Sequence, residues 1–122
     1  MMFSTNEINI VCTNGDSSLT FYRDILGFKV ISLEEGCWHL LCGETAFLLM
    51  PLATGPLVQH EYCSVPTISV DLVVDDLAKT KTYLENAGVR ILEKPAPNAN
   101  RFFIEDPDGL VFEIISKSRT GT

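Results

Sequence analysis

Two acidic residues inside apolar segments are the first candidates for chemistry in this chain. Asp71 interrupts the apolar run of residues 67–74, and Glu113 interrupts that of residues 110–116. Both runs are interpreted as strands. If the two carboxylates meet in a cavity, their repulsion raises the pKa of one of them and makes an acid–base pair. The alternative is that Asp71 is solvated at a sheet edge and that Glu113 is bonded to a neighbour or faces outward.

Aromatic side chains and two histidines form a second set of candidates. Trp38, Phe47 and Phe103 lie in expected strands, whose side chains alternate between two faces. Core packing is the default for each of them, although a Trp on a cavity-lining strand can stack on a flat ligand. His39 lies in an expected strand and His60 in a segment without periodicity, and both are interpreted as structural.

Composition excludes several classes of partner. The chain has 122 residues, of which 9 are basic and 16 acidic, and its formal net charge is −7. No stripe of Lys or Arg occurs, so we expect neither nucleic-acid nor membrane binding. The N-terminal residues MMFSTNEINI lack the basic and apolar regions of a signal peptide. We therefore expect a cytoplasmic protein.

The cysteines give the same indication. Cys12, Cys37, Cys42 and Cys63 show no CxxC spacing. Two disulfides are conceivable, but without a secretion signal reduced thiols are the better interpretation. The separation of Cys37 and Cys42 is a poor match to a zinc pair.

The second half of the chain repeats the first. INIVCTNGD (8–16) and ISVDLVVDD (68–76) are apolar runs that end in Asp, and a helical pattern that stops at Gly27 or Gly88 follows each. The offset is 60 residues before the helices and 61 after them, which indicates one extra residue in the second helix. A repeat of this length predicts two copies of one supersecondary unit.

Each copy is expected to contain a strand, a helix and three further strands. Asp16 is the expected N-cap of the first helix, and Gly27 its C-terminal stop. We expect a single domain over residues 1–122, with module one at about 5–50, a connector at 51–65 and module two at about 66–117. Two curved half-sheets can enclose a cavity, which equivalent positions of the two copies then face.

Two phrases identify a family that the chain resembles. FYRDILGFKV (21–30) and EDPDGLVFEI (105–114), on the doubled βαβββ order, resemble the vicinal oxygen chelate superfamily. This group includes glyoxalase I, bleomycin-resistance proteins, extradiol dioxygenases and fosfomycin-resistance enzymes. The resemblance implies an α+β fold in which two βαβββ modules form a cup-shaped mixed sheet with helices outside, and it implies a homodimer. The fold does not by itself specify an activity.

The resemblance also implies four positions where the metal enzymes of the family hold their ion, one on the first and one on the last strand of each module. By spacing, these positions are Asn9, Leu49, Ser69 and Glu113. Leu cannot ligate a metal, Ser and Asn are weak ligands, and one carboxylate holds a transition metal poorly. We therefore expect that the metal site is lost and that there is no cofactor. The alternative is one divalent metal ion held by a divergent ligand set.

Arg101 begins an expected strand, at a place where family members often direct a polar residue into the pocket. It is expected to pair with Glu113 or with an anionic ligand, and the alternative is a surface Arg. The residues expected to bind a ligand are Asn9, Trp38, Phe47, Leu49, Ser69, Asp71, Arg101, Phe103 and Glu113.

The leading hypothesis is a small-molecule-binding protein that resembles bleomycin-resistance proteins and sequesters an apolar or aromatic compound without a metal. The alternative is a glyoxalase-like or dioxygenase-like enzyme, a lyase or isomerase, with a divergent metal site or with metal-free acid–base catalysis by Glu113 and Asp71. A third hypothesis is a regulatory subunit whose cup is filled by its own side chains. Metal content separates the first two.

Overall fold

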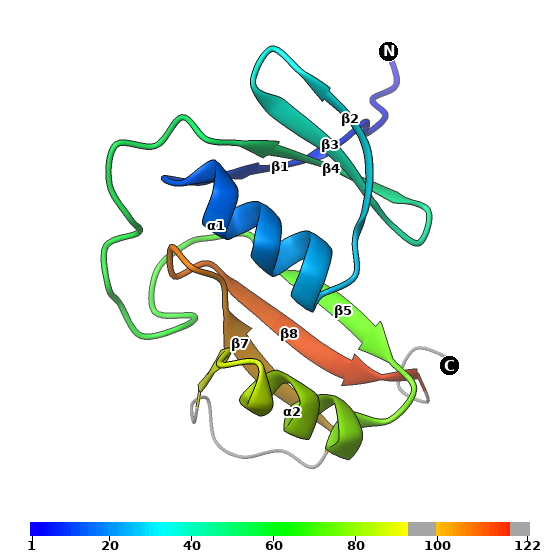
Figure 1. Ribbon diagram of the computed structural model, residues 1–122, viewed down its shortest axis with the longest axis vertical. Helices are drawn as coiled ribbons and strands as arrows, with labels where there is room; N and C mark the ends of the chain where they lie inside the picture. Colours follow the sequence, from blue (N-terminus) through cyan, green and yellow to red (C-terminus); the bar gives the residue numbers. More distant parts are fainter. Residues whose placement is uncertain (93–99, 118–122) are drawn as a thin grey trace. The chain divides into compact units, whose positions relative to one another are not determined.

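The chain folds into two compact units, Met1–Pro56 and Leu57–Thr122, and their boundary falls inside the expected connector. The structure is a computed structural model that describes residues 1–92 and 100–117. Each unit holds a four-stranded sheet and a helical segment, and each is described by itself (Figure 1).

The first unit has the strand order β1-β4-β3-β2. β1 runs parallel to β4, whereas β4, β3 and β2 form an antiparallel meander. The helical segment, α1 followed by η1, lies between β1 and β2 in the chain. The bounds are β1 Ile8–Val11, α1 Gly15–Leu19, η1 Thr20–Ile25, β2 Lys29–Glu34, β3 Cys37–Cys42 and β4 Thr45–Met50.

The second unit repeats this topology in the order β5-β8-β7-β6, again with one parallel pair. The expected α+β fold of two βαβββ modules in tandem is confirmed. No described helix is long and apolar enough to cross a membrane. The bounds are β5 Val70–Val74, α2 Leu77–Asn86, β6 Arg90–Leu92, β7 Arg101–Glu105 and β8 Val111–Ser116.

The helix caps correct one expectation. The N-cap of α1 is Asn14, whose side-chain Oδ1 accepts from the backbone N–H of Ser17 at 3.0 Å. Asp16, the expected cap, lies in the first turn instead, where its charge favours the helix N-terminus. In the second unit Asp76 is the cap and accepts from the N–H of Lys79 at 2.9 Å. Asn14 and Asp76 are therefore the equivalent positions of the repeat.

The sequence predicted the extra residue of the repeat in the second helix. It lies instead in the first helical segment. The chain from Asn14 to Gly27 is one residue longer than that from Asp76 to Gly88. Thr20–Ile25 winds as a π-helix, which takes up an additional residue within a helix. Gly27 and Gly88 both have positive φ, 79° and 81°, as the residue after a helix often requires.

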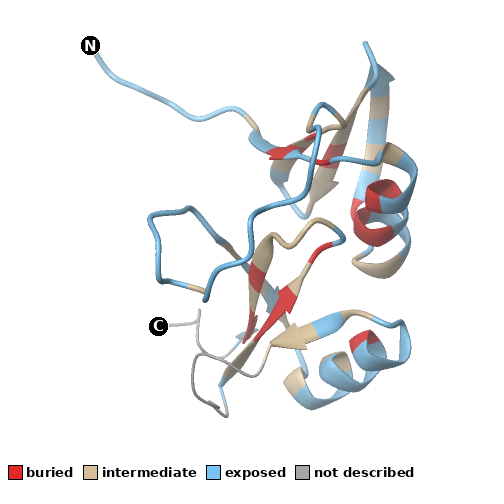
Figure 2. Ribbon diagram, turned by 90° about the vertical axis from the view of Figure 1, so that its left-hand side faces the viewer, coloured by how far each residue is buried: buried red, intermediate tan, exposed pale blue. Residues whose placement is uncertain are grey.

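Each sheet buries an apolar face, and we call this its helix face (Figure 2). In the first unit Phe47 packs against Phe28, with ring centroids 5.1 Å apart, and Phe28 lies against Tyr22. In the second unit the buried residues of the helix face include Ile104 and Ile114, and Leu84 of α2 is buried as well. Side chains two residues apart share a face, so the alternate positions point to the other side of each sheet, the far face.

Candidate functional site

The far face of the second sheet gathers most of the predicted polar residues of that unit. One row across it runs through Leu92, Phe103, Glu113 and Asp71, which are successive partners in the strand register. Arg101 is two residues before Phe103 on β7 and therefore lies on the same face. Asp71 and Glu113, the two acidic candidates, are thus brought side by side on neighbouring strands.

Glu113 forms an ion pair with Arg101. The Nη1 of Arg101 donates to Oε1 of Glu113 at 2.7 Å, and the side chains are 36% and 15% exposed respectively. The hydrogen bond to Glu113 and then its negative charge raise the pKa of Arg101, so the guanidinium remains charged. At this distance and partial burial the pair is a charge-assisted hydrogen bond.

Asp71 also acts on the same cation, since its charge contributes to the raised pKa of Arg101. Two carboxylates thus share one guanidinium. The two carboxylates are register partners beside this cation, and their role as an acid–base pair stays a prediction. The local charge that remains is negative.

An aromatic stack covers the middle of this row. The ring of Phe103 lies 5.0 Å from that of Tyr62, and the guanidinium of Arg101 lies 6.0 Å from the centre of the Phe103 ring. The hydroxyls of Tyr62 and Ser69 are 2.8 Å apart and share a hydrogen bond. Burial is the main cause that raises the pKa of Tyr62. The hydroxyl therefore remains protonated at neutral pH and can serve as a hydrogen-bond donor or acceptor.

The far face of the first sheet carries a different pair. His39 Nδ1 lies 2.6 Å from Oε2 of Glu7, and His39 Nε2 lies 3.8 Å from Oε2 of Glu34. A row of register partners runs through Ser32, His39, Leu48 and Asn9. The carboxylate of Glu7 at one ring nitrogen orients the imidazole, and the other ring nitrogen faces the carboxylate of Glu34.

The observed caps and registers correct the alignment of the two copies. Counting back from Asn14 and Asp76 makes Glu7, and not Asn9, the counterpart of Ser69. Asn9 then corresponds to Asp71. Since Asn9 pairs with Leu48 and Asp71 pairs with Glu113, the counterpart of Glu113 is Leu48 and the assignment of Leu49 was wrong.

Three predicted ligand residues of the first unit lie on its helix face. Phe47 and Leu49 are 1% and 0% exposed and belong to the core. Trp38 is the register partner of Leu49, and a Cβ on Gly15 would come within 2.8 Å of its ring, so the indole packs against the start of α1. The expectation that these three line a ligand surface is corrected by strand parity, because a one-residue error in register exchanges the two faces.

Two residues of the far faces were not recognised in the sequence as candidates. Tyr62 lies in a connector without periodicity, and its partner Phe103 is distant in the chain, so no local signal marked the contact. Glu7 could have been found, because Asn14 is as good an N-cap as Asp16 and the same spacing then leads to Glu7.

The chain belongs to the Glyoxalase/Bleomycin resistance protein/Dioxygenase superfamily, whose sequence profile matches residues 4–114. The repeated βαβββ topology described above is consistent with this match. The expected family is therefore confirmed.

The chain is similar to two proteins that bear enzyme names. The chain is 28% identical to Glyoxylase I 4 of Arabidopsis thaliana, over 91% of this chain and 69% of the relative. It is 23% identical to the glutathione transferase FosA of Serratia marcescens, over 93% and 81% of the two chains. The crystal structure of the fosfomycin resistance protein FosX of Listeria monocytogenes, complexed with Mn(II) and sulfate, matches with a TM-score of 0.75, 15% identity and coverage of 95% and 91%. At this identity the structural likeness concerns the fold.

Proposed function

We propose that this protein binds an apolar or aromatic small molecule without a metal ion, in the manner expected for bleomycin-resistance proteins of its superfamily. The observation that carries the proposal is the 2.7 Å bond from Arg101 to Glu113. Glu113 is the acidic residue of the second unit at a position where family enzymes hold a metal. The guanidinium that is already bonded to this carboxylate competes directly with any metal cation that would bind Glu113.

The other residues at equivalent positions fit a divalent metal no better. Ser69 shares its hydroxyl with Tyr62, Leu48 has no ligating atom, and Glu7 is engaged by His39. In the described part of the chain, no three side chains of His, Cys, Asp or Glu are grouped so that they could hold a metal ion. These residues therefore do not fit a divalent metal ion.

The second unit offers a suitable surface for a flat ligand. Phe103 is only 4% exposed. Tyr62 and Arg101, which contact its ring, are half-buried and offer a ligand stacking and cation–π contacts. Asp71 provides hydrogen-bond acceptors beside the ring. In the first unit, Asn9 is an exposed residue of the far face.

The test combines metal analysis with ligand screening. Protein purified without chelators is expected to contain far less than one transition metal ion per chain. We expect at least one compound among bleomycin, a naphthoquinone and other planar compounds to raise the melting temperature at concentrations well above micromolar. One bound metal per chain that disappears in Glu113→Ala, or no shift with any compound, would contradict the proposal.

A second candidate function is enzymatic, and the Glu7–His39 pair is its specific support. An imidazole oriented by a carboxylate at 2.6 Å is a suitable general base, whereas Arg101 restrains Glu113. Lyase and glutathione-transfer assays should then show activity that falls at least a hundredfold in His39→Asn and much less in Glu113→Gln. Equal activities in the two variants would rule out this assignment.

Two further expectations belong to the proposal. We propose a homodimer, which light scattering of the purified chain tests directly. We also propose a cytoplasmic location. Its support is that Cys37, Cys42 and Cys63 form no disulfide among the described residues, because reduced thiols suit a reducing compartment.

A further inference from the structure

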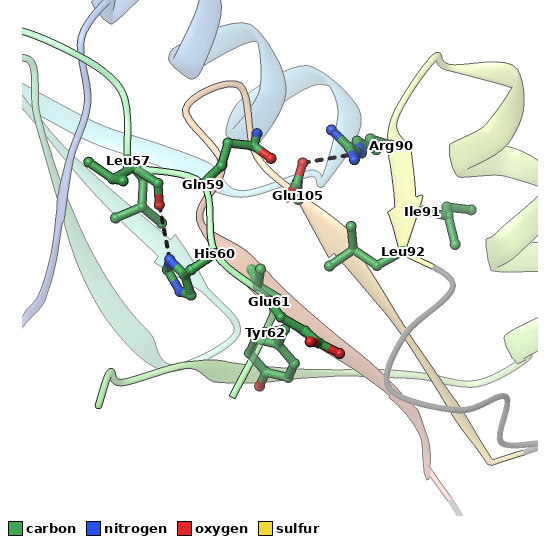
Figure 3. A pocket seen from close by; sticks show the side chains of 12 residues that line it. Leu57, Gln59, His60, Glu61, Tyr62, Arg90, Ile91, Leu92 and Glu105 are labelled. Carbon is green, nitrogen blue, oxygen red and sulfur yellow. Dashed lines mark hydrogen bonds and ion pairs between the residues drawn. The ribbon is translucent and has the colours of Figure 1, made fainter. Parts of the chain in front are cut away.

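A cavity lies on the far face of the second sheet, beside the Glu113 row. Its volume is about 390 Å³, within the range of small-molecule sites. One wall is the segment Leu57–Tyr62, which we call the strap, and the opposite wall is built from β6, β7 and β8 (Figure 3). The wall residues include Arg90, Leu92, Glu105 and Val111. Of the residues singled out in the sequence, His60 lines it.

The strap is held to the sheet at both ends. At one end, the N–H of Leu57 donates to the carbonyl oxygen of Asp108 at 3.1 Å. At the other end, Tyr62 shares a hydrogen bond with Ser69 and stacks on Phe103. A segment anchored at two points and arched between them leaves a cavity that exists before a ligand binds. Little ordering entropy is then lost on binding.

The polar part of the wall presents a donor and an acceptor side by side. Arg90 Nε lies 3.5 Å from Oε1 of Glu105, which is longer than a hydrogen bond. The side chain of Arg90 is 64% exposed, and a guanidinium carries five N–H donors, so this loose pair leaves donors for a ligand. Leu92 and Val111, on the neighbouring register positions, supply apolar area.

We propose that this cavity binds a small molecule with a flat apolar body and an uncharged amide-type head. The head accepts from Arg90 and donates to Glu105, while the body lies on Leu92 and Val111. An anionic head is disfavoured because Glu61 and Glu105 outnumber the cation of the wall. The inference rests on the proposed small-molecule binding and assigns to it a site and a ligand class.

Three probes with one body test the head group: naphthalene-2-carboxamide, 2-naphthoate and 2-naphthylmethylamine. Their dissociation constants are measured by fluorescence titration of the full chain. The carboxamide is expected to bind at least tenfold more tightly than 2-naphthoate. Glu105→Gln should narrow or reverse this preference, because it removes a negative charge and the acceptor of the amide N–H.

Two further variants locate the site. Arg90→Gln is expected to weaken carboxamide binding about tenfold, and Val111→Phe, which fills the cavity, should weaken it more. Arg23→Gln is the matched control, since Arg23 is also an exposed Arg in an ion pair, with Asp24 in the first unit. Thermal unfolding of each variant verifies that it folds, and Arg90→Gln remains informative if Val111→Phe does not.

The outcomes separate this inference from the proposed function. If the carboxamide binds equally well to wild type, Arg90→Gln and Glu105→Gln but is lost in Arg101→Met, the strap cavity is not the site and the proposed function survives. If no naphthalene probe and no planar compound binds the wild type, the proposed function fails as well. A preference for 2-naphthoate in the wild type would overturn the ligand class.

Discussion

The two units place different chemistry on the far faces of the same scaffold. At equivalent positions of the meander, the first unit has His39 where the second has Phe103, and Leu48 where the second has Glu113. Each unit nevertheless joins one carboxylate to a basic side chain, Glu7 to His39 at 2.6 Å and Glu113 to Arg101 at 2.7 Å. The difference is that imidazole can gain or lose a proton near neutrality, whereas guanidinium cannot.

The helix faces, in contrast, remain alike. Both are apolar and closely packed, with Phe47 and Leu40 in one unit and Ile104 and Ile114 in the other. Helix faces must fill the space under a helix, so their residues are restricted by packing. Far faces are less restricted, and this is where the copies diverge.

The largest expected effect compares a helix-face Phe with a far-face Phe. Phe47→Ala should destabilise the fold by about 3–5 kcal/mol, because it opens a cavity in the core of the first unit. Phe103→Ala should cost less, since Tyr62 can collapse onto the vacated space. It should also weaken ligand binding, because the strap loses the ring on which Tyr62 stacks. Urea unfolding and probe titration measure the two effects. A larger stability loss for Phe103→Ala would break the distinction between the faces.

The next effect tests the packing of Trp38 against α1. Gly15→Ala places a Cβ 2.8 Å from the Trp38 ring and should cost about 1–3 kcal/mol in urea unfolding. Gly55→Ala is the control, since no atom lies within 4 Å of its added Cβ, and it should be nearly neutral. Combining Gly15→Ala with Trp38→Phe should recover part of the loss. If the stability losses of the two single variants simply add in the double variant, the Trp38 ring is not the cause of the loss in Gly15→Ala.

A smaller effect tests the equivalence of the two caps. Asn14→Ala and Asp76→Ala should each lower the free energy of unfolding by about 1 kcal/mol, because each removes the acceptor of a helix N–H. Asp16→Ala should cost clearly less than Asn14→Ala. If Asp16→Ala proves the more damaging change, the realignment that makes Glu7 the counterpart of Ser69 loses its basis.

The smallest effect concerns the strap. Burial raises the pKa of Tyr62 above its ordinary value of 10.0. The stability that Tyr62 contributes is therefore fully present below pH 10.0 and declines as the pH rises through the folded pKa. The difference in ultraviolet absorbance between wild type and Tyr62→Phe should change with pH at a pKa above that of free tyrosine. A pKa at or below that of free tyrosine would mean that the Tyr62 ring does not stack on Phe103.

Much of the fold could be predicted from the sequence because local signals agree. The doubled order and the glycines after the helices predicted elements that are found within a few residues of their expected bounds. The cap at Asn14 was missed since Asn14 and Asp16 are both good caps, and the choice depends on how η1 winds. That choice shifted every first-strand equivalence.

The candidate site could be predicted only in part. Asp71, Arg101, Phe103 and Glu113 were expected and do share one face of one sheet. Trp38, Phe47 and Leu49 were expected beside them but belong to a helix face, because strand parity cannot be read without the register.

By itself, the sequence determined the family and the two βαβββ modules. These depend on residue identity and local spacing. Only the tertiary structure decided that the guanidinium of Arg101 bonds the carboxylate of Glu113 and that His39 pairs with Glu7. It also decided that the strap encloses a cavity against β6 to β8. These contacts join residues far apart in the chain, and their existence depends on register and loop path, for which no local pattern carries information.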